Sequence, residues 1–217
     1  SGDVTGNSVE VNGGTVIGNI QGGESDSGNV EANIVKMTEG SAIALIGGYS
    51  YSGNVTGNSV EIDGGTIDRN INGGNSETGN AVGNTVKMTG GSANWVIGAY
   101  SYQGDATGNM VDVSGGNLDG GVSGGESGSG NAENNVVVLD NVTATYLNGG
   151  YSDSGSSNGN SVVMNGGAVD YNAFGGYVDS SEGTASNNSF TLNGGIVSQS
   201  VFGGRSWSGN AENNVVT

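Results

Sequence analysis

The sequence has no cysteine, no proline and no histidine, and only 4 of its 217 residues are lysine or arginine. Without cysteine there is neither a disulfide framework nor a thiol-based site. Because histidine is missing too, Ser-His-Asp sets, Cys-His sets and ordinary zinc sites are excluded. So few basic residues cannot form the clusters that hold phosphate groups, and we therefore expect no nucleic-acid partner.

Long hydrophobic runs are missing as well. The longest uninterrupted apolar run covers residues 42–46, which is far shorter than a membrane-spanning helix. We therefore expect no membrane insertion of this segment. No signal peptide is recognisable at Ser1.

Glycine is abundant instead, with 46 residues, roughly three times its usual share. Collagen is excluded because proline and a three-residue period are both absent. Apolar residues make up 33% of the chain, so any core must be thin, but their regular placement argues against disorder. The formal net charge of −17 favours solubility and mutual repulsion of chains.

An internal repeat is marked by an asparagine that recurs every 25–28 residues along the whole chain. The motif reads approximately S-G-N-A-x-x-N-x-V-x-M-x-G-G-x-V-x-x-x-V-x-G-G-x-S. The repeats fill residues 1–217, which we therefore expect to form a single domain. Because the repeat pattern is interrupted at both ends, we expect this chain to be a piece of a longer protein. The repeats are 1–26, 27–51, 52–77, 78–102, 103–128, 129–153, 154–181, 182–207 and a partial 208–217. The asparagines are Asn7, Asn33, Asn58, Asn84, Asn109, Asn135, Asn160, Asn188 and Asn214.

Apolar residues lie two and four positions after each asparagine, as Val35 and Met37 follow Asn33. A period of two indicates a strand with one buried face. A Gly-Gly pair such as Gly64-Gly65 usually follows, and then a second strand with an apolar residue two positions before another Gly-Gly pair. We interpret both pairs as corners, because glycine readily adopts positive φ. A third short segment supplies a recurring serine.

These columns predict an all-β fold, a parallel β-helix with one coil of about three short strands per repeat, and the general twist preference of strands favours the right-handed form. A single coil cannot bury its own apolar face, whereas stacked coils can. Roughly eight and a half coils, about 4.8 Å apart, give a rod on the order of 40 Å long. The absence of proline fits this fold, because nearly every strand is central and needs its N–H groups for pairing.

Two columns of polar residues support in-register stacking. The asparagine column could bind a ligand, but its recurrence in every repeat favours a buried hydrogen-bonded ladder. The outward position between the two apolar columns alternates in charge in the early repeats, which favours pairing between neighbouring coils. That column reads Glu10, Lys36, Glu61, Lys87 and Asp112.

A family resemblance follows from the repeat itself. Residues 47–67 read G-G-Y-S-Y-S-G-N-V-T-G-N-S-V-E-I-D-G-G-T-I. This string resembles repeats in the passenger regions of bacterial autotransporter adhesins, which are type V secreted, haemagglutinin-like surface proteins. The likeness covers the whole chain, although not the signal peptide or the C-terminal translocating barrel of that family. It implies a right-handed parallel β-helix on the bacterial cell surface, without cofactors and usually without catalysis in the helix.

No constellation of catalytic residues stands apart from the repeat. Acidic side chains gather at one corner, where we interpret them as solvated charges rather than paired catalytic carboxylates. The period does not fit the nonapeptide of calcium β-rolls, and no aspartate column exists. We therefore expect no enzyme activity, no catalytic residues, no cofactor and no dedicated metal site. The corner carboxylates are Glu24, Asp26, Glu77, Glu126 and Asp153.

Features that are not repeated are the candidates for binding. Tyrosines gather at one corner, where exposed aromatic rings can stack on sugars or anchor protein partners. The seventh repeat is longer and its segment 177–182 predicts a loop, which in solenoids often carries binding. In the sixth repeat Asp140-Asn141-Val142 replaces a Gly-Gly corner, and because asparagine tolerates positive φ we interpret this segment as a variant turn. The candidate partner-binding residues are Tyr49, Tyr51, Tyr100, Tyr102, Tyr151, Tyr177, Asp179 and Glu182.

Three functions fit the sequence to different degrees. An extracellular structural or adhesive rod, binding a surface protein or a glycan receptor, explains the repeat, the acidity and the lack of catalytic residues. A self-assembling extracellular filament, growing by end-to-end stacking of coils, would explain strand edges left open at terminal coils. A polysaccharide-active β-helix enzyme explains only the fold.

Overall fold

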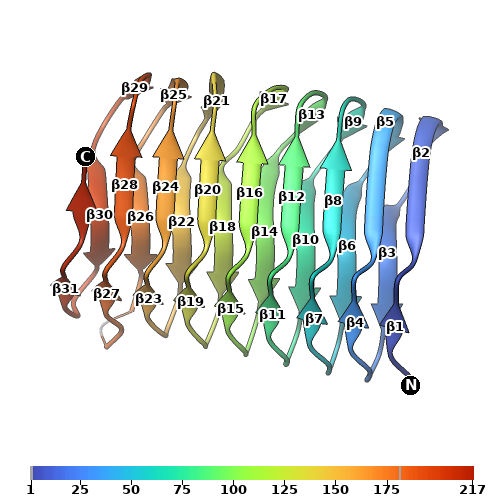
Figure 1. Cartoon of the computed structure of the whole chain (residues 1–217), viewed down its shortest axis with the longest axis horizontal. Coiled ribbons are helices and arrows are strands. Elements are labelled where there is room, and N and C mark those ends of the chain that lie inside the picture. The colour runs from blue at the N-terminus through green and yellow to red at the C-terminus, as the bar shows by residue number, and fades with distance from the viewer. Residues whose placement is uncertain (1, 181) are drawn as a thin grey trace.

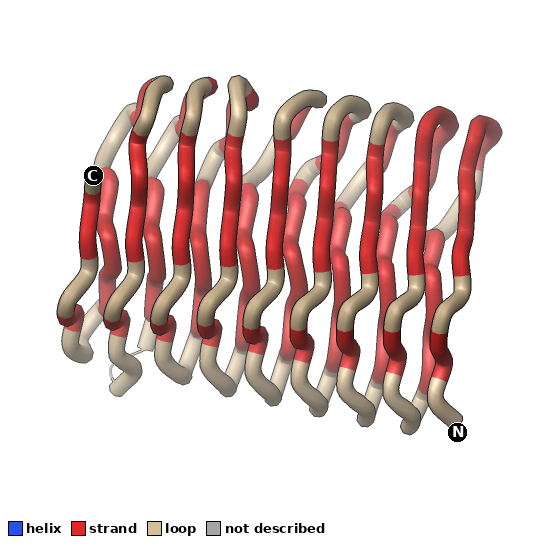
Figure 2. Tube along the Cα trace, in the orientation of Figure 1, coloured by secondary structure: helices blue, strands red, loops and turns tan. Residues whose placement is uncertain are grey.

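The computed structural model describes residues 2–180 and 182–217, in which the chain forms only strands, turns and loops (Figure 2). The strands stack as a β-solenoid with one coil per repeat (Figure 1). In each coil the chain rises through a front sheet, crosses a corner, descends through a rear sheet and returns through a narrow sheet. The coils advance from the N-terminus at the right of Figure 1 to the C-terminus at the left, so the solenoid is right-handed, as the family resemblance and the twist preference of strands imply.

The front and rear sheets are parallel throughout. The front sheet contains β2 (Ser8–Thr15), β5 (Ile34–Ala42), β8 (Ser59–Ile62), β12 (Thr85–Met88), β16 (Met110–Val113), β20 (Val136–Leu139), β24 (Ser161–Met164), β28 (Ser189–Leu192) and β32 (Val215–Val216). The rear sheet contains β3 (Asn19–Ser25), β6 (Ala44–Ser50), β10 (Asn70–Ser76), β14 (Trp95–Ser101), β18 (Val122–Ser127), β22 (Leu147–Ser152), β26 (Ala173–Val178) and β30 (Val201–Ser206).

Short strands complete each coil. The narrow sheet contains β1 (Val4–Thr5), β4 (Val30–Glu31), β7 (Val55–Thr56), β11 (Ala81–Val82), β15 (Ala106–Thr107), β19 (Ala132–Glu133), β23 (Ser157–Asn158), β27 (Ala185–Ser186) and β31 (Ala211–Glu212). Beyond the upper corner lie β9 (Thr66–Ile67), β13 (Ser92–Ala93), β17 (Asn117–Leu118), β21 (Val142–Ala144), β25 (Gly167–Val169) and β29 (Ile196–Val197). Most coils therefore have one short strand more than the three that the sequence predicts, while β2 and β5 run through this corner without a break.

The predicted apolar columns form the core. Val35 pairs with Val60 in the front sheet, Leu45 pairs with Ile71 in the rear sheet, and all four side chains are fully buried. Because each buried residue stacks on its equivalent in the next coil, the thin core is continuous along the axis. The register that the repeat predicts is therefore confirmed.

The asparagine column is a buried hydrogen-bonded ladder. The Oδ1 atom of Asn58 accepts from both the backbone N–H and the Nδ2 of Asn33, each at 2.9 Å. The Nδ2 of Asn58 donates in turn to Asn84 at 3.0 Å and to the carbonyl oxygen of Val30 at 3.0 Å. Every bond between these amides runs in the same direction, from one coil to the next. The structural interpretation of this column is confirmed.

Two further ladders stabilise the corner between the rear and narrow sheets. Ser76 donates from Oγ to the carbonyl oxygen of Gly53 in the preceding coil and accepts from the N–H of Gly79, both at 2.9 Å. Four positions before each buried asparagine lies a second polar column, in which Asn54 accepts from the N–H of Asn80 at 2.9 Å. The recurring serine was recognised in the sequence, but this second column was not, although it is part of the S-G-N motif.

The second Gly-Gly pair of each repeat is not a corner, contrary to the sequence-based interpretation. These glycines lie within the rear strands, and none has a positive φ in the described residues. A Cβ atom on Gly73 would come well under 3.0 Å from the carbonyl oxygen of Gly98, and one on Gly74 would overlap the amide of Asn84. The asparagine ladder and the next coil occupy the space of a side chain, so the first position is glycine in every coil and the second is glycine in all but one, where it is the small residue Ala99.

The first Gly-Gly pair does form a corner. Gly65 has a φ of 94°, and in the sixth repeat the positive φ, of 57°, falls on Asn141, one position earlier in the coil. Both lie in the left-handed region, which glycine and asparagine tolerate best. The interpretation of this pair, and of Asp140-Asn141 as a variant of it, is confirmed.

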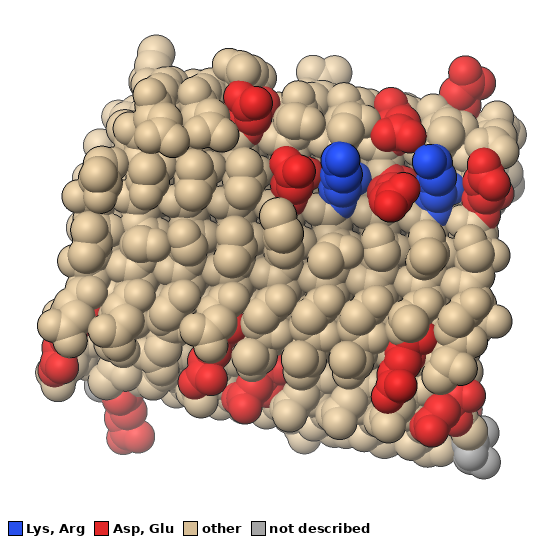
Figure 3. Space-filling view, viewed as in Figure 1, with Lys and Arg blue, Asp and Glu red and all other residues tan. Residues whose placement is uncertain are grey.

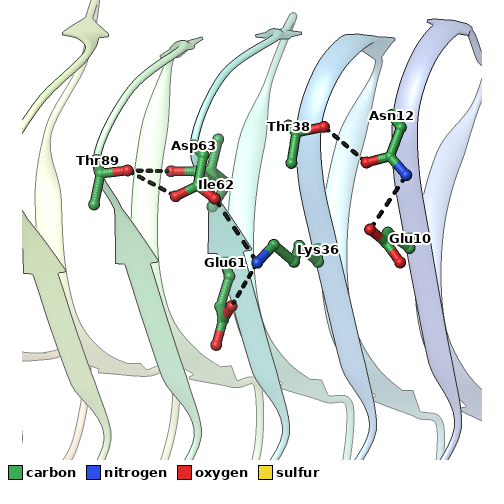
Figure 4. Close-up of polar contacts among 8 residues, drawn as sticks. All are labelled: Glu10, Asn12, Lys36, Thr38, Glu61, Ile62, Asp63 and Thr89. Carbon is green, nitrogen blue, oxygen red and sulfur yellow. Dashed lines mark hydrogen bonds and ion pairs between the residues drawn. The ribbon is translucent and has the colours of Figure 1, made fainter.

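The charged column lies on the outer face of the front sheet, where acidic and basic side chains alternate in one row (Figure 3). Glu10, Lys36, Glu61, Lys87 and Asp112 are in register in consecutive strands. The Nζ of Lys36 lies 3.8 Å from Glu61 and 3.9 Å from Asp63 (Figure 4). In the part of the chain that the structure describes, Lys87 makes no ion pair within 4.0 Å.

Replacing Lys36 by glutamate should lower the melting temperature at low salt. The variant places a third carboxylate between Glu10 and Glu61, and like charges on neighbouring strands repel each other. Because Lys36 is partly exposed, with 40% of its side-chain surface accessible, we expect the free energy of unfolding to fall by about 1 kcal/mol. Lys87→Glu is the matched control with a smaller expected loss, and equal melting temperatures of Lys36→Glu and the parent would contradict the charge pairing.

Candidate binding groove

The outer face of the rear sheet carries three columns of side chains that differ from repeat to repeat. The first, the wall column, consists of the residues directly before the buried apolar residues of the rear strands, such as Trp95. The second, the floor column, follows those residues and includes Ile97. The third, the tyrosine column, lies three positions beyond the floor column and includes Tyr100.

A groove of about 510 Å³ lies between these columns. Its lining comes from β10, β14, β18, β22, β26 and β30 and the residues beside them, so at about 4.8 Å per coil it runs roughly 24 Å along the axis. Wall and tyrosine columns form its two sides. The lining residues are Asn70, Trp95, Ile97, Glu126, Tyr146, Asn148, Tyr151, Asn172, Phe174, Tyr177, Arg205 and Trp207.

One side of the groove is a row of stacked aromatic rings. Trp95 and Tyr146 are nearly parallel, at 11°, with centroids 6.3 Å apart. Tyr146 stacks in turn on Tyr171 at 5.0 Å. The coil between Trp95 and Tyr146 has Gly120 and Gly121 at this place, and a Cβ atom on either would collide with the indole of Trp95. The glycines therefore leave the space in which Trp95 lies against the backbone.

The C-terminal end of the groove is built around Arg205. Its guanidinium carbon lies 5.4 to 5.8 Å from the ring centroids of Phe202, Trp207 and Tyr177. Phe174 stacks on Phe202 at 5.2 Å and on Tyr177 at 4.8 Å. Such cation–π and aromatic contacts hold the long arginine side chain in place.

Polar atoms interrupt the apolar floor. The side chains of Ser123 and Asn148 are in register, and they are 0% and 9% exposed. Within the described residues, Asn148 Oδ1 has no hydrogen-bond partner. An unpaired polar atom in such a position is costly unless a ligand or solvent group supplies the missing bond.

Glu126 extends into the groove between Tyr100 and Tyr151, its neighbours in the tyrosine column. Burial raises the pKa of Glu126 from 4.5 to about 7, and the nearby carboxylate of Asp153 contributes to the rise. The interpretation of Glu126 as a solvated corner charge is wrong, because its carboxyl group is largely buried. Its position on the rear strand, three residues beyond the floor column, places it among aromatic rings.

Replacing Glu126 by glutamine should stabilise the rod above pH 7 but not at pH 4. The folded-state pKa is above the unfolded one, so the folded protein loses stability as pH rises from about 4.5 through 7. A shift of this size corresponds to about 3 kcal/mol at 1.36 kcal/mol per pKa unit, and solvent screening of this partly exposed carboxyl reduces it to about 1–2 kcal/mol. Urea unfolding at both pH values measures the difference. Glu39→Gln, which removes one exposed charge elsewhere, is the control, and an equal gain in both variants would contradict the assignment.

The predicted tyrosines divide into three groups. Tyr151 and Tyr177 line the groove. Tyr49 and Tyr100 belong to the same column but lie beyond the lining of the groove. Tyr51 and Tyr102 project from the corner beyond the rear sheet, where they are 58% and 53% exposed.

Three tyrosine hydroxyls donate hydrogen bonds to carboxylates at the corner. Tyr177 donates to Asp179 at 2.8 Å, Tyr49 donates to Glu77 at 3.3 Å, and Tyr151 donates to Asp153. Burial, together with the bond to Asp153, raises the pKa of Tyr151, so its hydroxyl stays protonated at neutral pH. Asp179 thus positions a groove residue, while Glu182 is exposed and lies outside the groove. Ser181, in the same predicted loop, lies outside the described residues.

Most of the groove was missed in the sequence. Trp95, Tyr146, Phe174, Arg205 and Trp207 were not selected, because they are spread over several columns of the repeat and none of these columns is aromatic in every coil. A signal was present nonetheless. Trp207 and Phe202 fall in the repeat 182–207, and Phe174 falls in the repeat before it, at positions where most other repeats have no aromatic residue.

No group of three or more His, Cys, Asp or Glu side chains that could hold a metal ion occurs among residues 2–180 and 182–217. The same residues include no helix of the length and hydropathy needed to cross a bilayer. Comparison of the chain with protein-family models, with curated proteins and with solved structures finds no match in any of the three.

Proposed function

We propose that this chain is an extracellular adhesive rod of a bacterial surface protein, and that the groove on the rear sheet is its adhesive site. The observation that carries the proposal is the break in the repeat. Side chains of the core and the ladders recur in every coil, whereas the aromatic residues gather on one face of neighbouring coils.

The solenoid suits such a role because its outer face is held rigidly. Each rear strand inside the stack is paired on both sides, and the asparagine ladder fixes the spacing of the coils from within. Rigid aromatic side chains lose little conformational entropy on binding and dominate the energetics of many interfaces. The extracellular, bacterial location is supported by the resemblance of the repeats to autotransporter passenger regions.

Adhesion of beads coated with the protein to cultured epithelial cells and to bacterial cells tests the proposal. We expect the double variant Tyr146→Ala/Trp207→Ala to lose most of the adhesion of the parent. The matched control is Tyr51→Ala/Tyr102→Ala, which removes two exposed rings outside the groove and should leave adhesion unchanged. Melting temperatures of both variants check that the rod remains folded.

Two results would contradict the proposal. Adhesion that is lost only in the control variant would place the adhesive surface at the corner, and a parent that adheres to neither cell type would argue against adhesion. Light scattering of the same samples over a range of concentrations measures end-to-end assembly into filaments, the alternative that the sequence left open.

A further inference from the structure

We propose that the groove binds a neutral glycan chain that lies along the solenoid axis. This inference rests on the proposed adhesive function and names the class of its ligand. The shape of the site is the first argument. The lining of the groove continues over six rear strands, which suits an extended linear polymer better than a compact small molecule.

The chemistry of the lining is the second argument. Sugars present patches of C–H groups that pack on aromatic rings, together with hydroxyl groups that donate and accept hydrogen bonds. Trp95, Tyr146 and Trp207 supply rings at the sides of the groove. The unpaired Oδ1 of Asn148 on the floor requires a donor, and a sugar hydroxyl supplies one.

The charges of the groove decide which glycans fit. Its charged side chains are Glu126 and Arg205, and Arg205 is already engaged by three aromatic rings. Asp153 and Asp179 add negative charge beside the tyrosine column, in a chain whose net charge is −17. An acidic polysaccharide would be repelled, so the ligand is a neutral chain.

A peptide strand is the main competing ligand, and the backbone argues against it. Peptides that bind along a sheet usually pair with an unpaired strand edge. The rear strands β10, β14, β18, β22 and β26 all have hydrogen-bonded neighbours on both sides, and the outer edge of β30 lies across the end of the groove, so no free edge runs along it. A peptide would depend on side-chain contacts alone.

Tryptophan fluorescence provides a direct measurement, because the two tryptophans of the chain both line the groove. We expect a saturable change in emission when the full chain is titrated with at least one of a panel of neutral polysaccharides: hydroxyethyl cellulose, laminarin, xylan, galactomannan and dextran. Hyaluronan and heparin should give no saturable change at the same ionic strength. Isothermal calorimetry on the parent confirms the dissociation constant.

Two variants at equivalent positions test the role of the floor. Asn148 and Asn72 occupy the same column, each is 9% exposed, and the Oδ1 of each is unpaired in the described residues, but only Asn148 lines the groove. Asn148→Ala should weaken binding of the neutral glycan about tenfold, whereas Asn72→Ala should leave it unchanged. Tyr146→Ala should weaken binding by a similar factor, and Tyr146→Phe should retain it.

The outcomes separate the ligand class from the adhesive function. Absence of a saturable change with every neutral polysaccharide, tighter binding of heparin, or equal losses in Asn148→Ala and Asn72→Ala would each overturn the glycan assignment. If adhesion to cells is lost in the Tyr146→Ala/Trp207→Ala variant but no neutral polysaccharide binds or competes, the adhesive function stands and the ligand is a protein. If that variant still adheres like the parent, the proposed function itself is wrong.

Discussion

Replacing Asn109 by alanine is expected to lower the free energy of unfolding by about 4 kcal/mol. The Oδ1 of Asn109 accepts from the N–H and the Nδ2 of Asn84, at 2.9 and 3.1 Å. Its Nδ2 donates to the carbonyl oxygen of Ala81 and to Asn135, both at 3.0 Å. The variant removes all four bonds from a fully buried position and leaves a cavity beside polar groups that have lost a partner.

Urea unfolding followed by circular dichroism measures this loss. Asn54→Ala is the matched control, because Asn54 belongs to the exposed polar column and accepts from one backbone N–H. We expect Asn54→Ala to lower the free energy of unfolding by less than about 1 kcal/mol. Similar losses in the two variants would mean that burial of the ladder contributes little to stability.

Replacing Gly73 by alanine is expected to lower the free energy of unfolding by about 3 kcal/mol or more, although the substitution adds a single methyl group. The added carbon would collide with the carbonyl oxygen of Gly98 and lie 3.0 Å from the carbonyl oxygen of Thr85. Both are backbone atoms within paired strands, so neither can turn aside as a flexible side chain would. The coils would have to separate locally, which strains the pairing of β10 with β14.

The control for this variant is Gly18→Ala, since a Cβ atom on Gly18 would have no neighbour within 4 Å. Its stability should remain within about 0.5 kcal/mol of the parent. Thermal unfolding of the two variants side by side gives the comparison. A small loss in Gly73→Ala would indicate that the coils are less tightly spaced than the structure shows.

The stacking of the coils could be predicted from the sequence because it depends on residues that recur. Val35, Val60 and Val86 each occupy the same place in their coil, so one periodic column fixes the pairing of three strands. The asparagine ladder follows from the same reasoning. The charges of Glu10, Lys36 and Glu61 then identify the outer face independently.

The rear Gly-Gly pairs show where this reasoning fails. A sequence contains no direct sign of whether glycine is needed for its φ or for the space that a side chain would fill. Gly65 and Gly73 look alike in the repeat, yet the first turns the chain at a positive φ and the second lies in an ordinary strand against its neighbouring coil. Only the position of the asparagine ladder distinguishes them.

The groove could not be predicted for a different reason. Its residues come from three columns and from coils that are far apart in the sequence, so Trp95 and Tyr146 meet only after Gly120 and Gly121 have left a gap between them. The fold is recognised from the residues that recur in every repeat. The groove is formed by residues that differ between repeats, so a consensus of the repeats does not contain them. Tyr151 and Tyr177 were found because they share a column with other tyrosines.

The direction of the hydrogen bonds has a mechanical consequence. In this solenoid the bonds between strands, and those of the asparagine ladder, point along the axis from coil to coil. Tension applied to the two ends would therefore load the terminal bonds first and peel the coils away one at a time. Each coil of 25–28 residues would release about 90 Å of extended chain, while the coils behind it stay folded. A rod of this design can lengthen stepwise under load and lose the groove only when the peeling reaches the coils that line it.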